Sequence, residues 1–174
     1  MAQLDDLTYK TMTELVLSPE HIMAIGLLAA EWGYVESLVE LLIWRLAKMP
    51  ESIGYCITTH IGSVMRIDML KTLAHETLSD QSIQDEIKSI SAEFERLRIM
   101  RNDIIHSMWI RKDFFGSGAP VSLRVKAKGR VDMQTKVQNY EDIRKAASDM
   151  TALTVRIGSV LQKLPKRSSS LRNP

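Results

Sequence analysis

Apolar residues recur every three or four positions over most of the chain, which is the spacing of one face of an α-helix. Ser18, Pro19 and Glu20 form a strong helix start, because serine caps, proline fits the first helical position and an early acid suits the helix dipole. Pro50 ends the first helix, and the polar run 79–82 separates the second from the third. The pattern therefore predicts four long helices, over residues 18–49, 51–78, 83–109 and 140–164.

Residues 121–137 alternate with a period of two, which is typical of β-strands. A two-residue turn at Lys128 and Gly129 would oppose apolar to polar positions, so we expect a three-residue loop over 128–130. That loop pairs like faces: Val125 with Met133, and Lys126 with Asp132. The predicted fold class is all-α, a four-helix up-and-down bundle with a small β-hairpin inserted between the third and fourth helices.

The length and the charge distribution refine this prediction. A chain of 174 residues suits one packed core, so we expect one helical domain over 18–164, an N-terminal arm over 1–17 and a disordered basic tail over 165–174. The net charge is +2, but residues 1–107 carry nine basic and sixteen acidic residues, a charge of −7. Residues 108–136 carry seven basic and two acidic residues. This asymmetry favours a polyanionic or acidic partner.

The cellular compartment is predicted from what the sequence lacks. Glu31 interrupts the apolar run Ile22–Ala30, so we expect no membrane span, and the N-terminus has no secretory signal pattern. Cys56 is the single cysteine and cannot form an internal disulfide, which fits a reducing cytoplasm. We expect Cys56 to be a small core residue.

Two charged residues interrupt apolar stripes on the predicted helices. Arg101 lies in the stripe of the third helix and Glu36 in that of the first. A charge buried alone costs on the order of several kcal/mol, so each residue needs a partner. We expect Glu36 and Arg101 to meet, or to line one polar notch. The stripes consist of Ile90, Phe94, Leu97, Ile104 and Met108, and of Ile25, Ala29, Trp32, Val39 and Ile43.

Further polar residues accompany Arg101. Asn102 and His106 are four residues apart and share a helix face with Arg98 and Trp109. A cation, an amide and an imidazole on one face can bind a phosphate and move a proton near neutral pH. The run 101–106 is therefore the candidate site.

In these residues the sequence resembles the HEPN family of small helical proteins. The family signature is Arg, a polar residue, a few variable residues and His near the end of the third helix, and Arg101-Asn102-Asp103-Ile104-Ile105-His106 matches it. The first helix over 32–46, and Ser107-Met108-Trp109 followed by a hairpin and a closing helix, are also similar to the family. The resemblance covers roughly residues 20–164, and the chain shows no companion domain or second signature.

The resemblance implies a metal-independent endoribonuclease without a cofactor, in which the motifs of two subunits form one composite site. Arg101 would hold the scissile phosphate and stabilise its added charge. His106 would be general base on the ribose 2′-OH or general acid to the 5′-oxygen, with Asn102 orienting the phosphate or the imidazole. Glu36 would hold Arg101, a role inferred from the helical wheel. Such nucleases are often toxins or defence proteins neutralised by a partner protein.

A basic surface could follow an RNA backbone without reading its sequence. An ordinary solvated face explains the same residues. Leu38 and Leu42 would be apolar surface available to a homodimer. The predicted RNA-binding residues are Arg98, Arg111, Lys112, Arg124, Lys126, Lys128 and Arg130.

Three alternatives stay open. The first is a non-catalytic HEPN-like module that binds a nucleotide, RNA or a protein. The second is a metal–carboxylate bundle, although the chain contains no Glu-x-x-His motif. The third is a structural adaptor without a site, in which the histidines are ordinary surface or core residues and Trp32 and Trp44 are core. The residues available to the metal reading are Glu36, Glu40, His60, His75 and His106.

Overall fold

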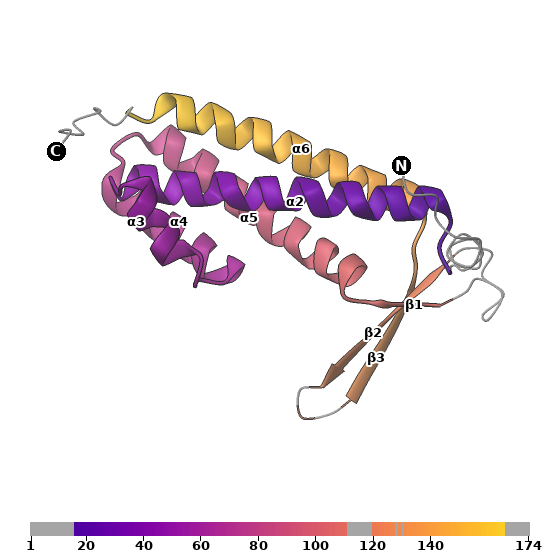
Figure 1. Cartoon of the computed structure of the whole chain (residues 1–174). Helices are drawn as coiled ribbons and strands as arrows, with labels where there is room; N and C mark the ends of the chain where they lie inside the picture. Colours follow the sequence, from indigo (N-terminus) through magenta and orange to yellow (C-terminus); the bar gives the residue numbers. More distant parts are fainter. Residues whose placement is uncertain (1–15, 111–119, 128, 130, 166–174) are drawn as a thin grey trace, which may run out of the picture. The chain divides into compact units, whose positions relative to one another are not determined.

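A computed structural model describes residues 16–110, 120–127, 129 and 131–165. This part of the chain forms five helices and one three-stranded antiparallel sheet (Figure 1). The predicted arm and tail lie almost entirely outside the described residues. The elements are α2 (Pro19–Leu46), α3 (Glu51–Thr58), α4 (Ser63–Thr77), α5 (Gln81–Ile105), β1 (Met108–Ile110), β2 (Val121–Ala127), β3 (Val131–Val137) and α6 (Tyr140–Lys163).

The chain divides into two compact units. One comprises Met1–Ala29 and Met100–Ala147, and the other comprises Ala30–Ile99 and Ser148–Pro174. The first unit holds the sheet and the last turn of α5. The second unit holds α3, α4 and most of the helical core.

The helix starts follow the predicted signals. The Ser18 hydroxyl accepts a hydrogen bond from the His21 amide at 3.5 Å, and the Ser18 carbonyl accepts one from Ile22 at 3.1 Å, so α2 begins at Pro19 as expected. Asn139 precedes α6, and its carbonyl accepts the Ile143 amide at 3.4 Å. Both predicted helices are confirmed.

The helical core of the second unit is aromatic and aliphatic. Trp32 packs on Phe94 with ring centroids 4.7 Å apart, and Trp44 packs edge-on against Tyr55 at 4.5 Å. Trp32 and Trp44 are each 4% exposed, so both are core residues as predicted. Burial of such side chains dominates the stability of a small domain. Other members of this core are Val35, Val39, Leu42, Ile43, Ile67, Leu70, Ile87, Ile90, Leu97, Met150, Leu153, Ile157 and Val160.

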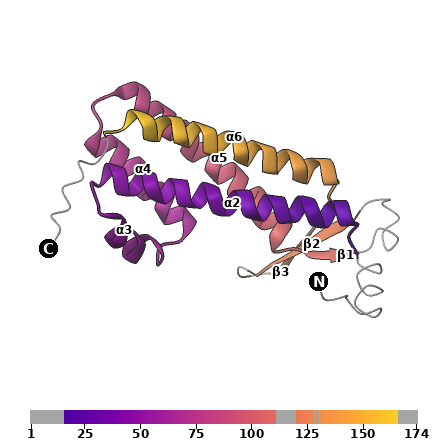
Figure 2. The same ribbon diagram turned by 45° about the horizontal axis from the view of Figure 1, so that its top comes forward.

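The single helix predicted over 51–78 is wrong, because the chain breaks it into α3 and α4 (Figure 2). The Thr58 hydroxyl donates back to the Gly54 carbonyl at 3.0 Å. The Thr58 carbonyl accepts the Arg66 guanidinium at 2.9 and 3.2 Å and also the Ile61 amide at 3.1 Å, which closes a tight turn where an α-helix would continue. Gly62 is extended, with φ −69° and ψ 157°, and α4 begins after it. A tertiary contact therefore stops a segment whose local pattern is helical.

Two predictions of burial near these elements are wrong. Cys56 is exposed, because α3 buries the face of Gly54 and Thr58, and Cys56 points elsewhere at about 100° per residue. Leu42 is fully buried, so it offers no dimer surface, whereas Leu38 is half-buried.

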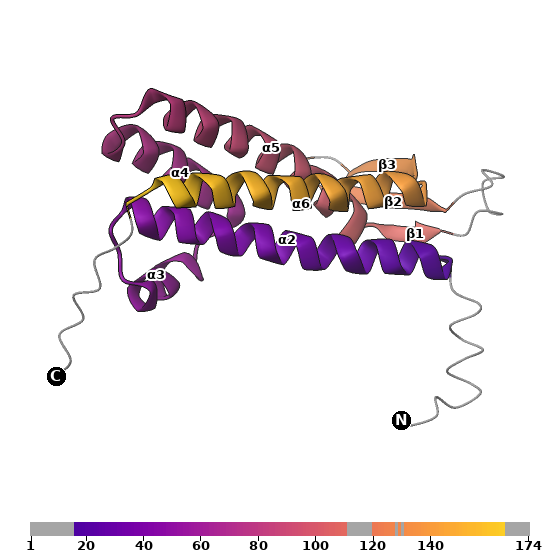
Figure 3. The same ribbon diagram turned by 90° about the horizontal axis from the view of Figure 1, so that it is seen from above.

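The β-hairpin forms with the predicted register. Val125 pairs with Met133 and Lys126 with Asp132, and the connection is the three-residue loop 128–130. Gly129 has φ +76°, a conformation that glycine adopts without strain. The sequence did not reveal a third strand. α5 ends at Ile105 and not at Trp109, and Met108–Ile110 pairs with β2, giving the order β1-β2-β3 (Figure 3).

The helix α2 is unusually apolar. Its most apolar 18-residue window has a mean hydropathy of 1.4 with 28% of the window buried, so α2 alone meets a length and composition test for a membrane span among the described residues. The core helix of a soluble protein passes the same test. Composition alone therefore does not decide what α2 packs against.

Candidate functional site

The candidate site lies on the last turn of α5 and the residue that follows it. Arg101 and Asn102 belong to α5, and the His106 amide still donates to the Asn102 carbonyl at 3.1 Å. Ile104 is 1% exposed on the inner side of the same turn. The backbone of this turn is thus fixed by a helical hydrogen bond and by core packing, which holds the three polar side chains together.

The structure brings Arg101, Asn102 and His106 into contact as predicted. Arg101 Nη1 donates to Asn102 Oδ1 at 3.0 Å and lies 3.0 Å from His106 Nε2. A guanidinium has only donors, so a hydrogen bond in this contact requires His106 Nε2 to accept, which is the tautomer with the ring proton on Nδ1. Asn102 and His106 therefore share one nitrogen of Arg101.

The Nε atom of the Arg101 guanidinium is buried and makes no hydrogen bond among the described residues. An arginine offers five N–H donors, and the contacts with Asn102 and His106 use those of Nη1 alone. A buried donor without a partner is uncommon and calls for an explanation, such as an ordered water, an ion or a ligand; His21 Nε2 and Trp44 Nε1 are in the same condition.

The nearest acid in the sequence, Asp103, is engaged elsewhere. Asp103 forms an ion pair with Arg124 of β2, and its carbonyl accepts the Ser107 hydroxyl at 2.5 Å. No carboxylate pairs with Arg101 among residues 16–110, 120–127, 129 and 131–165. Its positive charge faces the amide oxygen of Asn102 and a ring nitrogen of His106, an environment that favours an anion such as a phosphate.

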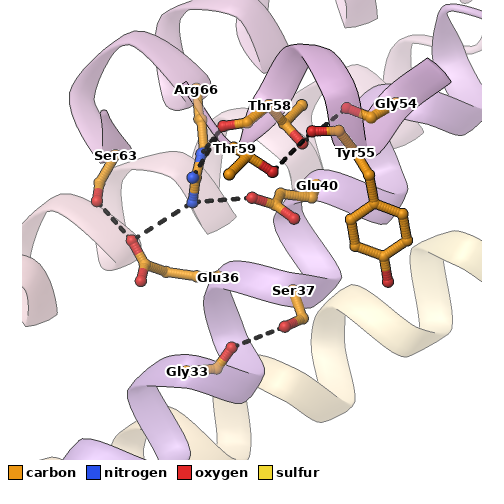
Figure 4. Close-up of polar contacts among 10 residues, drawn as sticks. All are labelled: Gly33, Glu36, Ser37, Glu40, Gly54, Tyr55, Thr58, Thr59, Ser63 and Arg66. Carbon is orange, nitrogen blue, oxygen red and sulfur yellow. Dashed lines mark hydrogen bonds and ion pairs between the residues drawn. The ribbon is translucent and has the colours of Figure 1, made fainter. Parts of the chain in front are cut away.

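Glu36 does not have the partner that we expected. Its Oε1 accepts the Ser63 hydroxyl at 2.5 Å and lies 3.7 Å from Arg66 Nη1, while Glu40 pairs with the same nitrogen at 3.0 Å (Figure 4). The pairing of Glu36 with Arg101 was therefore wrong. A helical wheel gives the direction of a side chain but not the neighbouring helix, and here α4 supplies the cation. Glu36 serves the α3–α4 connection, because Arg66 also binds the Thr58 carbonyl.

Of the predicted RNA-binding residues, the structure describes the side chains of Arg98 and Arg124, and both are in ion pairs. Arg98 is paired with Glu95 at 2.8 Å, and Arg124 is paired with Asp103. Neither guanidinium is an unengaged cation. Lys126 belongs to β2, but the described structure does not include its side chain. Arg111, Lys112, Lys128 and Arg130 lie outside the described residues.

Sequence reasoning missed the two arginines that consume the nearby acids, Arg66 and Arg124. From the sequence alone we predict RNA binding for Arg124 and treat Asp103 as a variable position of the motif. The spacing of Glu36 and Glu40, one turn apart on one face, was the signal that a cation should face them.

The described residues offer no set of ligands for the metal-binding alternative. No cluster of three or more His, Cys, Asp or Glu side chains that could hold a metal ion occurs in the part of the chain that the structure describes. His60 and His75 are both exposed. Glu36 and Glu40 are engaged by Arg66.

No family model matches the chain, and neither a curated protein nor a solved structure matches it. The likeness to the HEPN family therefore rests on the residues of the chain. The geometry around Arg101 is the feature from which its function has to be inferred.

Proposed function

We propose that the chain is a HEPN-type, metal-independent endoribonuclease that acts as a homodimer with a composite Arg/His site. The observation that carries the proposal is the contact of Arg101 with His106 at 3.0 Å, without a carboxylate on Arg101 among the described residues. A structural arginine is normally compensated by an acid, as Arg66 is. A cation compensated only by neutral groups suits a phosphodiester.

The chemistry follows from the donors and the acceptor of the cluster. A phosphate that takes the Arg101 N–H groups also releases His106 Nε2, which then accepts the proton of the ribose 2′-OH. The 2′-oxygen attacks phosphorus, the bond to the 5′-oxygen breaks, and the products are a 2′,3′-cyclic phosphate and a 5′-OH. Protonation of the leaving 5′-oxygen requires a second acid, which in the composite site is the protonated His106 of the other subunit. Arg101 stabilises the charge that develops on the phosphoryl oxygens.

The resemblance carries three further parts of the proposal. The protein acts in the cytoplasm, cuts RNA as a toxin or a defence protein, and is held in check by a neutralising protein partner. Each part concerns the biology around the site and is separable from the chemistry at His106.

A cleavage assay tests the enzyme proposal. End-labelled single-stranded RNA is incubated in EDTA with wild type, His106→Ala and the matched control His75→Ala, which removes an exposed histidine of α4. We expect wild type and His75→Ala to cut, His106→Ala to be inactive, and a 2′-deoxy substrate to resist. Size-exclusion chromatography with light scattering shows whether lost activity is a lost dimer. Equal cutting by His106→Ala contradicts the proposal.

A second candidate is a non-catalytic module that binds RNA or a nucleotide. It is favoured by the same hydrogen bond, because Arg101 occupies the lone pair that a general base needs. For this module we expect wild type and His106→Ala to bind RNA equally without cutting, and Arg101→Ala to lose binding. The cleavage assay separates the two candidates, and filter binding at two salt concentrations measures the RNA binding that the module predicts.

A further inference from the structure

The strand β3 is an outer edge of the sheet. The strand order is β1-β2-β3, and β3 is hydrogen-bonded on one side by β2 over its whole length, Val131–Val137 (Figure 3). On its other side no strand is paired within the described residues. A seven-residue edge presents a row of backbone N–H and C=O groups, which is a template for another strand.

One face of this edge is apolar and exposed. Val131, Met133 and Val137 are 68%, 66% and 46% exposed, and Val125, directly across from Met133, is 54% exposed. Residues two apart on a strand, and residues paired across strands, share a face. Within the described residues the sheet therefore has an exposed, mainly apolar strip next to a backbone edge that no strand pairs, two features that natural edge strands normally avoid.

We propose that a second copy of this chain docks on this edge, with the two β3 strands antiparallel and Gln134 on the two-fold axis. The evidence is that β3 is complementary to itself in this register. Asp132 then lies opposite Lys136 of the second copy, twice by symmetry, and the apolar face is kept on one side. The remaining pairs are Val131 with Val137, Met133 with Thr135 and Gln134 with itself.

The charges of the neighbouring strand agree with this register. In the register within the chain Lys126 is paired with Asp132 and Arg124 with the central Gln134. The Asp132 carboxylate also accepts a hydrogen bond from Gln134 Nε2 at 2.9 Å. No row of the combined sheet opposes like charges. Centring the pair on Met133 would place Lys136 opposite Arg130, and a one-residue slip would turn the apolar face of one copy to the polar face of the other.

This geometry closes after two copies. An isologous contact uses the same edge in both subunits, so no β3 edge is left to extend the sheet. The inference is independent of the nuclease proposal, because it concerns association through residues 131–137 and not the cluster at Arg101. Its test measures association alone, so a chain that cuts no RNA leaves it intact.

Charge reversal tests the register with the full-length chain. Asp132→Lys creates two lysine pairs across the axis and Lys136→Asp creates two aspartate pairs, so we expect each variant to dimerise about tenfold more weakly or worse. The double variant D132K/K136D restores opposite charges and should dimerise as wild type does. A mixture of the two single variants should form a heterodimer, because both of its pairs are attractive.

Sedimentation velocity over a range of protein concentrations gives the dissociation constants, and circular dichroism confirms that each variant folds. Monomeric wild type overturns the proposal. Single variants that dimerise as tightly as wild type overturn it too, even if wild type is a dimer through another face. If the double variant does not recover the dissociation constant of wild type, the two charges do not lie opposite each other as the register requires, and the register is overturned.

A cysteine placed on the axis gives a second readout. In a Cys56→Ser background, Gln134→Cys puts two thiols directly opposite each other, where cross-strand Cβ atoms lie about 4.5–5.5 Å apart. We expect mild oxidation to give a covalent dimer. The matched control Ser159→Cys places an exposed thiol on α6, away from the β3 edge, and should give no covalent dimer under the same conditions. Equal cross-linking of the two variants contradicts the proposal.

Discussion

Replacement of Gly54 by alanine tests how tightly the α3 segment packs. A Cβ atom at Gly54 would lie 2.6 Å from Cγ, Cδ2 and Cε2 of Trp44, closer than real Cβ contacts come. These atoms belong to the ring of a side chain that is 4% exposed and packed against Tyr55. The indole therefore has to move inside a packed core, which forces neighbouring side chains to follow.

Two opposing terms set the magnitude. Overpacking of a core costs about 1 to 3 kcal/mol. Alanine in place of glycine within a helix returns about 0.5 to 1 kcal/mol, because the unfolded chain loses conformational freedom. We expect Gly54→Ala to lower the free energy of unfolding by about 1 to 2 kcal/mol, since the clash involves rigid ring atoms and not the end of a flexible chain.

Gly158 provides the matched control. It lies inside α6, and a Cβ atom there would meet nothing within 4 Å. The same substitution should therefore raise the stability by about 0.5 to 1 kcal/mol. Equilibrium urea unfolding, followed by far-UV circular dichroism, compares the free energy of unfolding of both variants with that of wild type. One common dependence of this free energy on urea concentration is used for all three proteins. A further variant, Gly54→Ala in a Trp44→Leu background, should recover the helix-propensity gain. Stabilisation by Gly54→Ala alone would refute the reasoning.

Three other substitutions probe the ion pairs and the α5 cap. Arg66→Met leaves two carboxylates uncompensated, so we expect a loss of about 2 to 3 kcal/mol in urea unfolding, less than for a fully buried pair because the side chains keep 13% to 27% exposure. Hydrogen bonds from the Ser82 side chain and from backbone amides hold the pKa of Asp80 below its ordinary 3.8. The stability that these bonds contribute is therefore present above pH 3.8 and is lost as the pH falls through the lower folded-state pKa. Asp80→Asn should remove that acid-dependent loss of stability. Arg124→Gln should lower stability by up to about 1 kcal/mol, and a double-mutant cycle with Asp103→Asn should show that the two effects are coupled.

Local periodicity was sufficient for most of the helices and for the hairpin. Pro19 and Tyr140 begin helices where the capping residues placed them, and burial follows the three-to-four spacing at Phe94 and Leu97. The hairpin register followed from a single criterion, that apolar positions share one face, which paired Val125 with Met133. These features depend on neighbours in sequence, so the sequence contains the information that decides them.

Features decided by distant partners were not predictable in the same way. The break after Thr58 depends on Arg66, eight residues later, which binds its carbonyl. The strand at Met108–Ile110 exists because β2 offers it an edge, and three residues are too few to show a period. A stripe on a helical wheel gives an angle only, so it identified Glu36 as needing a cation without showing which helix would supply it.

Arg66 and Arg101 show what such a stripe can and cannot decide. A charge among apolar neighbours predicts a partner, and for Arg66 the partners are carboxylates and a carbonyl, which account for the residue as structure. Arg101 instead meets an amide and an imidazole acceptor, and its Nε is buried without a partner. A purely structural guanidinium would gain from an acid, and the adjacent Asp103 is used by Arg124. Within the described residues Arg101 therefore has no carboxylate partner, and this is the observation that the proposed anionic ligand would explain.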